Sequence, residues 1–457
     1  MENTLNNSFK DMPEIIDLSI KMNNANEVIG IYEGLFNLQN EDVVIKINGK
    51  IQYHWFPEKG AKFEGVVLEE NNDPLKTINS LNDYFLQIEG LSVGKAFITN
   101  RTFGLSKDAI NIKGVFVKNV VIGDSSINVD SITFSIPNLK QFYGTPVKKK
   151  LKESVSCFKS RIELDNDDYL IFIDKTINYE ERIKNLESNG GSLLLYSGRI
   201  VRKKGDLTFD NSMLLFDCLD TFLTFVNGRR IETIFHKGLY QDDPIWSDFS
   251  NYTFDAYKKS TSWTKSRLDE GLNDLFKRFC EIWKDVNDRN FLVSVVHWYI
   301  QANNNSGYTE GSIVMAQTAL ELIYNWLLIE RKGLLLGRDA DNISAANKIR
   351  LLLAHLKIST KVPVHFSELE SFVDSSKEYN DAPDAIVQIR NAIIHSQIEK
   401  RKKISALSLR TKDEALQLSI WYIEMSLLYI LEYKGDYSNR CSNDPYPKNR
   451  VEKVPWV

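Results

Sequence analysis

Three residues suited to phosphate chemistry lie close together near the C-terminal end of the chain, namely Arg390, Asn391 and His395. An imidazole has an ordinary pKa of about 6.5, so it can accept or release a proton near neutral pH. A guanidinium presents a planar fork of donors that fits two oxygens of one phosphate. The spacing R-N-A-I-I-H therefore predicts a phosphate site with acid–base chemistry. The structural alternative is a surface arginine and a hydrogen-bonded histidine.

The segment that must position these residues runs from Ala382 to Ile404 and reads APDAIVQIRNAIIHSQIEKRKKI. It is predicted to be a helix. Pro383 suits a first helical turn, and Asp381 or Asp384 can accept hydrogen bonds from the free amides at the helix start. The helix dipole favours cations at the other end. The basic residues there are Lys400, Arg401, Lys402 and Lys403.

The faces of this helix follow from its periodicity. Its apolar stripe, at positions i, i+3 and i+7, consists of Ile386, Ile389 and Ile393. At about 100° per residue, Asn391 and His395 share one side of the helix, and His395 points almost opposite the stripe. Arg390 lies about 140° from His395 around the axis. Only its long stem, a bend in the helix or a second copy of the helix could bring both side chains onto one phosphate.

The composition limits the class of protein. The chain has 457 residues, of which 43% are hydrophobic and 26% charged, which predicts a soluble globular protein of two or three domains and excludes a disordered or fibrous one. A net charge of -4 gives no overall cationic field, so a nucleic acid would be held by local basic patches. No signal peptide, bilayer-length stretch or metal-ligand spacing is found, so we expect a cytoplasmic protein with no membrane partner, metal or cofactor.

Strand patterns dominate the first half of the chain. From about residue 28 to about residue 230, short runs of β-branched and aromatic residues alternate with polar ones and are separated by turn signals such as Asn48-Gly49. The run LTFDNSMLLFDCL, residues 207–219, is included among these strands, and one helix, ERIKNLESNGG, interrupts them. Residues 1–240 are therefore predicted to form an antiparallel sandwich or barrel, and residues 241–261, which lose both periodicities, a connector.

Helical patterns dominate the second half, so the fold class is α+β multidomain. Residues 262–435 are predicted to form an all-α bundle, and residues 436–457 a polar tail that is either a strap or a loose end. Besides the helix of Arg390, helices are expected near residues 263–286, 289–303, 308–332, 342–356, 367–378 and 411–434.

One of these helices carries an isolated line of polar residues. IVMAQTALELIYNWLLIE is apolar around most of its circumference, yet Gln317, Glu321 and Asn325 fall four residues apart. Glu321 either pairs with Arg390 and fixes its guanidinium or faces solvent, and the pattern leaves both possibilities open.

The R-N-A-I-I-H spacing resembles the signature of the HEPN ribonucleases. The order of GIYEGLFNL, SSINVDSITFSIPNLKQFYG, VNGRRIETIF and the late R-N-x-x-x-H is similar to the ApeA-like antiphage proteins, over nearly the whole chain. The resemblance implies that residues 262–435 are an HEPN-type bundle and that residues 1–240 sense or regulate. It implies an abortive-infection endoribonuclease that works as a homodimer or higher homo-oligomer, with a phage-derived trigger.

The resemblance also assigns roles to residues. Arg390, Asn391 and His395 would cleave RNA through its own 2′-hydroxyl without a metal, with Glu321 in support. The basic residues Lys400, Arg401, Lys402 and Lys403 would bind the RNA. A second hypothesis is a non-cleaving HEPN module that binds RNA, a nucleotide or a protein, with the β domain as sensor. A third is that the β domain is the effector and the bundle only dimerises it.

Overall fold

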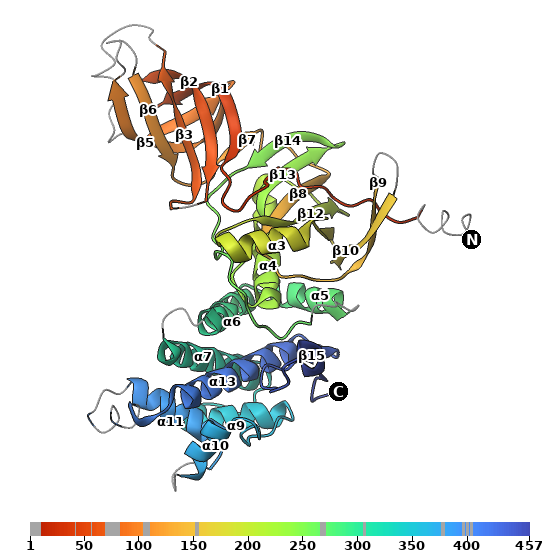
Figure 1. Cartoon of the computed structure of the whole chain (residues 1–457), viewed down its shortest axis with the longest axis vertical. Helices are drawn as coiled ribbons and strands as arrows, with labels where there is room; N and C mark the ends of the chain where they lie inside the picture. Colours follow the sequence, from red (N-terminus) through yellow and green to blue (C-terminus); the bar gives the residue numbers. More distant parts are fainter. Residues whose placement is uncertain are drawn as a thin grey trace. The chain divides into compact units, whose positions relative to one another are not determined.

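The structure is a computed structural model that describes residues 11–41, 43–55, 57–68, 83–103, 110–150, 155–265, 271–304, 308–375, 380–394, 398, 402 and 405–457. The chain divides into two compact units. The first consists of residues 1–220 and 231–258, and the second of residues 221–230 and 259–457. Strands dominate the first unit and helices the second (Figure 1). This confirms the predicted order of an antiparallel β-rich region followed by a helical region.

Six strands of the first unit close into an antiparallel barrel in the order β1-β2-β3-β6-β5-β4. They are β1 (Ile29–Gln39), β2 (Val44–His54), β3 (Gly60–Val67), β4 (Tyr84–Ile88), β5 (Leu91–Phe103) and β6 (Ile110–Phe116). Side chains alternate between the interior and the outside of the barrel, and Ile45 and Ile47 on β2 are buried on the inner side. A barrel was one of the two architectures that this alternation predicted.

The other strands of the first unit form an eight-stranded antiparallel sheet in the order β7-β14-β13-β8-β12-β11-β10-β9. They are β7 (Val121–Gly123), β8 (Ser131–Pro137), β9 (Thr145–Lys150), β10 (Val155–Asp165), β11 (Tyr169–Lys175), β12 (Leu194–Arg202), β13 (Ile234–Tyr240) and β14 (Asp243–Asp248). Helices α3 (Tyr179–Asn189) and α4 (Phe209–Asn227) pack on it. Tyr179 contacts Tyr196 of β12, and Phe216 contacts Phe134 of β8, with ring centroids 5.7 and 5.9 Å apart.

Two predictions for this region are wrong. Residues 207–219 do not form a strand, because most of them lie in α4. Their buried side chains recur at helical spacing, which a short apolar run does not separate clearly from strand spacing; they include Phe209, Ser212, Leu215, Phe216 and Leu219. The predicted connector, residues 241–261, contains β14, which pairs with β13 and buries Trp246.

The second unit contains the predicted helices in the predicted order. They are α5 (Gly271–Trp283), α6 (Val286–Asn304), α7 (Thr309–Tyr324), α9 (Ala345–His355), α10 (Ser367–Asp374), α11 (Ala382–Ile394) and α13 (Leu409–Ile430). The prediction missed the short α8 (Arg338–Asn342) and the change of α7 into a π-helix, η1 (Asn325–Arg331). Residues 221–230, which were expected in the β domain, belong to this unit. Phe222 packs on Phe276 and Phe225 on Tyr299, with centroids 5.1 and 5.9 Å apart.

One helix in the described part of the chain, Thr309–Arg331, is long and apolar enough to cross a membrane by length and composition. This corrects the expectation that no stretch reaches that length. In the structure 61% of its apolar window is buried inside the protein. The core helix of a bundle passes the same test, so the finding is weak evidence for a membrane.

Candidate functional site

Helix α11 begins at an N-terminus that the neighbouring helix α9 holds in place. Asp381 Oδ1 accepts a hydrogen bond from the amide of Asp384 at 3.0 Å, so Asp381 fills the capping role for which both carboxylates were candidates. Arg350 of α9 donates to Asp381 from Nε and Nη2, at 2.7 and 2.8 Å, and to Asp384 at 2.5 Å. Burial alone would raise the pKa of Asp384, but the hydrogen bond from Arg350 lowers it overall. The start of α11 is thus fixed to α9 by charge-assisted hydrogen bonds.

The inner face of α11 is the predicted isoleucine stripe. Ile386 and Ile389 are fully buried, and Ile393 is half-buried near the end of the helix. Gln317 of α7 is also buried, and its Nε2 donates to the carbonyl of Ile386 at 2.7 Å. The stripe and this hydrogen bond fix the rotation of α11 about its axis, and therefore the direction in which Arg390 leaves it.

Arg390 has an unusual environment for a half-buried arginine. Its Nη1 donates to Oδ1 of Asn391 at 3.1 Å, while its Nε is buried and has no hydrogen-bond partner among the described residues. No described carboxylate forms an ion pair with it. An arginine has five N–H donors and no acceptor. The guanidinium therefore retains donors that can bind an external anion.

The structure gives Glu321 a different partner. Its side chain is 56% exposed, and Lys348 Nζ lies 3.5 Å from its Oε1. Within the described part of the chain Glu321 and Arg390 form no ion pair, so of the two alternatives the exposed position is the one observed. The polar line on α7 is thus split, with Gln317 facing α11 and Glu321 facing solvent.

Part of the predicted site lies outside the described residues. The residues that lie outside are His395, Lys400, Arg401 and Lys403. Lys402 is described and exposed. Arg390 and Asn391 are the two motif residues whose surroundings are defined, and the acid–base role of His395 remains a prediction. Among the described residues, no group of three or more His, Cys, Asp or Glu side chains could hold a metal ion.

A hydrogen-bonded chain in the first unit has the connectivity of a nucleophilic triad. Thr233 Oγ1 lies 3.0 Å from His236 Nε2, and His236 Nδ1 lies 3.2 Å from Asp248 Oδ2. All three side chains are buried, with Thr233 fully inaccessible, and His236 stacks on Phe216 at 3.8 Å. A substrate cannot reach the Thr233 hydroxyl, so these three hydrogen-bonded residues form a satisfied polar network in the core.

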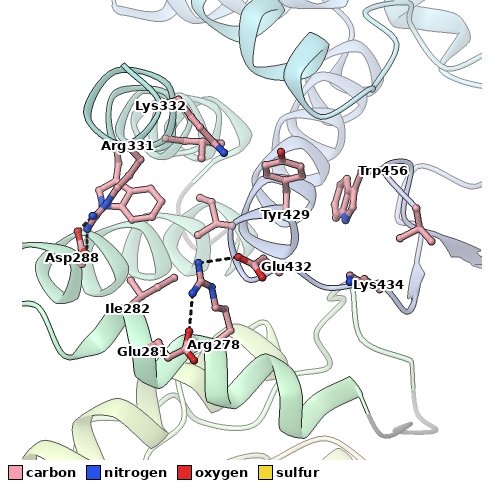
Figure 2. Close-up of a pocket in the computed structure, with 14 residues that line it drawn as sticks. Arg278, Glu281, Ile282, Asp288, Arg331, Lys332, Tyr429, Glu432, Lys434 and Trp456 are labelled. Atoms are coloured by element: carbon pink, nitrogen blue, oxygen red, sulfur yellow. Dashed lines mark hydrogen bonds and ion pairs between the residues drawn. The ribbon is translucent and has the colours of Figure 1, made fainter. Parts of the chain in front are cut away.

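The sequence analysis missed a pocket of about 730 Å³ in the second unit. Figure 2 shows its walls, which come from α5, α6, η1, the end of α13 and the C-terminal tail. Charged, aromatic and aliphatic side chains line it. Most of these segments are far apart in the sequence, so no local sequence pattern predicts the pocket.

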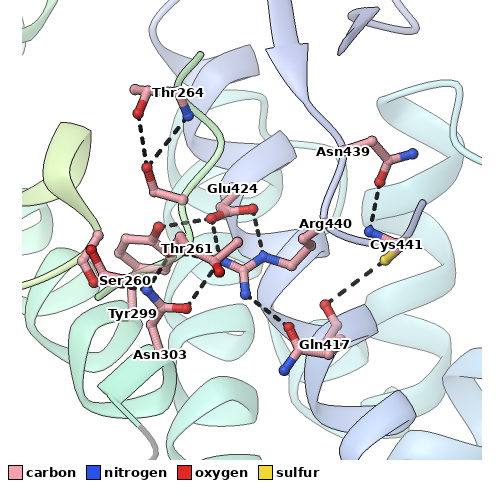
Figure 3. Close-up of polar contacts among 12 residues, drawn as sticks. Ser260, Thr261, Thr264, Tyr299, Asn303, Gln417, Glu424, Asn439, Arg440 and Cys441 are labelled. Atoms are coloured by element: carbon pink, nitrogen blue, oxygen red, sulfur yellow. Dashed lines mark hydrogen bonds and ion pairs between the residues drawn. The ribbon is translucent and has the colours of Figure 1, made fainter. Parts of the chain in front are cut away.

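A second feature that the sequence analysis missed is a buried ion pair at the start of the tail (Figure 3). Arg440 Nε and Nη2 donate to the two carboxylate oxygens of Glu424 on α13, at 2.8 and 2.6 Å, and both side chains are almost fully buried. Tyr299 donates to the same carboxylate at 2.7 Å, and Asn303 accepts from Arg440 at 3.0 Å. The tail, with β15 (Asp436–Ser438) and β16 (Val451–Lys453), is therefore a strap and not a loose end.

Comparison with known proteins gives three findings. Residues 124–260 match the family model "YopA central domain", and residues 285–452 match "YopA C-terminal domain". The chain is 26% identical, over 439 residues, to the SPbeta prophage-derived uncharacterized protein YopA of Bacillus subtilis (strain 168). The aligned residues cover 94% of this chain and 95% of that protein. No solved structure matches the chain. The chain is thus similar to YopA over almost its whole length.

Proposed function

We propose that this YopA-like chain, in which Arg390 pairs with no carboxylate of the described residues, is an endoribonuclease of antiphage defence that cleaves RNA without a metal. The carrying observation is the half-buried guanidinium of Arg390, which keeps donors unused among the described residues. The R-N-A-I-I-H spacing, the helical unit that carries it and the resemblance to ApeA-like HEPN proteins support the same proposal. The prophage origin in the relative's name agrees with a role in conflict between phage and host.

In the proposed reaction, His395 takes the proton from the 2′-hydroxyl, and the 2′-oxygen attacks the adjacent phosphorus. The bond from phosphorus to the 5′-oxygen breaks, and the leaving oxygen takes a proton from a second His395. Arg390 binds the non-bridging oxygens, whose charge increases in the transition state. Asn391 Oδ1 already accepts from Arg390, so its amide group can donate to the same phosphate. The products are a 2′,3′-cyclic phosphate and a 5′-hydroxyl.

This reaction needs an acid and a base, and one imidazole provides one of them at a time. We therefore propose a homodimer or higher homo-oligomer in which two copies of α11 face one RNA strand. Lys402, which is exposed, and the neighbouring Lys400, Arg401 and Lys403 would bind the flanking phosphates. The β-rich unit would restrain the nuclease until a phage-derived trigger acts.

The test is incubation of the purified protein with total RNA in excess EDTA, followed by mapping of the cleaved ends. Wild type should produce cyclic phosphate ends, whereas His395→Ala and Arg390→Ala should not. Gln388→Ala is the matched control, because Gln388 is an exposed polar residue on the same helix. Cleavage that persists in both variants would show that Arg390 and His395 are not the catalytic residues. RNA binding without cleavage in wild type, with or without phage infection of the source cells, would favour the non-cleaving binding module.

A further inference from the structure

The pocket in the second unit is independent of α11, since none of its described lining residues belongs to that helix. The π-helical turn η1 lies along it and supplies Trp326 and Arg331. Such turns are rare and occur frequently at functional sites, because they reorient side chains out of the regular helical spacing. A volume of about 730 Å³ is suited to a ligand the size of a nucleotide.

The carboxylates of the pocket are all engaged by arginines. Arg278 forms ion pairs with Glu281 at 2.7 Å and with Glu432 at 2.9 Å. Asp288 pairs with Arg331 and also accepts from the indole Nε1 of Trp326 at 3.0 Å. In Figure 2 the pairs Arg278–Glu432 and Arg331–Asp288 join different segments of the wall, whereas Arg278 and Glu281 both belong to α5. The two arginines therefore offset two of these three negative charges.

Two lysines in the same wall remain without a counter-charge. Lys332 follows η1 and Lys434 follows α13, and both are exposed pocket residues. Within the described part of the chain neither forms an ion pair with a carboxylate. With these two ammonium groups the pocket is lined by four cationic and three anionic side chains, and this excess of one positive charge favours an anionic ligand.

The pocket also offers two aromatic surfaces at right angles. The rings of Tyr429 and Trp456 have centroids 5.3 Å apart and an interplanar angle of 90° (Figure 2). Both are only partly buried, so ring surface remains accessible. The Tyr429 hydroxyl lies 3.1 Å from His355 Nε2, and the Trp456 Nε1 donates to the carbonyl of Tyr433 at 2.8 Å, which fixes both rings. A flat ring can pack into such a corner.

We propose that this pocket binds a small ligand that combines a planar ring with a phosphate, of the nucleoside monophosphate class. The ring packs against Tyr429 and Trp456, and the phosphate binds Lys332 and Lys434. This site is separate from the proposed RNA-cleaving site and does not depend on it.

The test is calorimetric titration of the full chain with AMP, GMP, CMP and UMP, and with adenosine and inorganic phosphate as half-ligands. At least one monophosphate should bind. The affinity of each half-ligand should be lower than that of the monophosphate by a factor of about ten or more. Lys332→Ala and Lys434→Ala should each weaken binding by about fivefold or more. Both lysines are exposed, so thermal unfolding should confirm that the variants fold.

Two controls locate the binding. Lys361→Ala removes an exposed lysine of the same unit that does not line the pocket, and it should leave the affinity unchanged. Arg390→Ala should also retain binding, and loss of binding in that variant would place the ligand at α11 and overturn the proposal. Three other results would also overturn the proposal: none of the four monophosphates binds, the variant that combines Lys332→Ala with Lys434→Ala binds with full affinity, or inorganic phosphate binds as tightly as a nucleotide.

Discussion

At the scale of single residues, Arg390 differs from two other internal arginines of this protein, Arg161 and Arg440. Arg161 pairs with Asp174 at 2.7 Å and Arg440 with Glu424 at 2.6 Å, in both cases with the charge compensated inside the protein. Among the described residues, Arg390 has only the neutral Asn391 as a side-chain hydrogen-bond partner, and its buried Nε is unsatisfied. An unsatisfied buried donor costs about 1–3 kcal/mol of stability.

This difference leads to a prediction for Arg390→Met. The methionine fills similar space without an unsatisfied donor, so the free energy of unfolding in urea should stay equal or rise by up to about 1 kcal/mol. RNA cleavage in EDTA should fall by about 100-fold or more, because the phosphate loses its guanidinium. Arg350→Met is the control, and it should lose about 2 kcal/mol because it leaves two carboxylates unpaired. A similar loss in Arg390→Met would make Arg390 a structural residue.

A second residue-scale prediction concerns Glu232 in the first unit. Burial, with the negative charges of Asp217 and Asp248, raises its pKa to about 7, although the amide of Thr253 and the ammonium of Lys59 oppose the shift. The native state therefore binds this proton more tightly than the unfolded state does. The contribution to stability is complete below the ordinary pKa of about 4.5 and is lost as the pH rises through about 7. The unfolding free energy of the wild type should fall between pH 5 and pH 8.

Glu232→Gln should flatten that part of the pH profile in urea unfolding monitored at several pH values. The flattening is partial, because Asp220 also has a raised pKa, caused first by burial and then by the charge of Glu232. Glu33→Gln, at an exposed position of β1, should leave the slope as in the wild type. An unchanged slope in Glu232→Gln would show that this carboxyl keeps its ordinary pKa in the folded protein.

At the scale of elements, the tail is held by one buried charge pair. Arg440 reaches α13 through Glu424 and α6 through Asn303, and the residues that follow it form β16 and end in the Trp456 ring at the pocket. Because the pair lies in a low-dielectric interior, removal of one partner leaves a charge without compensation. The strap and the pocket wall that it carries therefore depend on the pair as a whole.

Glu424→Ala should destabilise the second unit by about 3–5 kcal/mol, whereas Glu424→Met combined with Arg440→Met should cost clearly less, because no charge is then left unpaired. Hydrogen exchange should show that the single variant loses amide protection in strands β15 and β16 before it loses protection in the helices of the second unit. The exposed pair of Arg278 with Glu281 is the comparison, and Glu281→Ala should cost less than about 1 kcal/mol. Equal costs for the single and double variants at the buried pair would contradict this account.

A second element, α4, belongs to both units. Its first part packs on the eight-stranded sheet, and Phe222 and Phe225 in its last turns pack on Phe276 and Tyr299 in the helical unit. A fragment that begins at the predicted boundary of residue 262 would lack both phenylalanines. It would expose the apolar surfaces of α5 and α6 that they cover, so the helical unit is complete only with residues 221–230.

At the scale of the whole molecule, the proposed chemistry requires two copies of the chain. Helical spacing predicts that Arg390 and His395 lie about 140° apart around one helix, and one histidine cannot act as base and acid at once. If two copies of α11 form the site, the rate of RNA cleavage per chain should fall on dilution, in parallel with the dimer fraction measured by sedimentation. Gln388→Ala should follow the same curve. A rate per chain that is constant while the dimer dissociates would show that one copy is sufficient.

Local sequence patterns determined which segments form most of the elements. The period of about 3.6 residues, with its caps and apolar stripes, placed the helices of the second unit, and Ile386 and Ile389 are buried as their spacing predicted. Alternation of period two identified the β-rich half. These features depend on interactions between residues a few positions apart, which is why a single sequence contains them. The same periods failed for residues 207–219, where a short apolar run fits both.

Only the tertiary structure decided which distant residues meet. Glu321 pairs with Lys348 and not with Arg390, Arg350 of α9 pairs with Asp381, and Arg440 of the polar tail is buried against Glu424. The pocket likewise assembles from segments that share no local pattern. In each case the deciding energy is the burial or pairing of a charge across the fold. Such pairing depends on how the helices pack together, and no spacing along the chain encodes it.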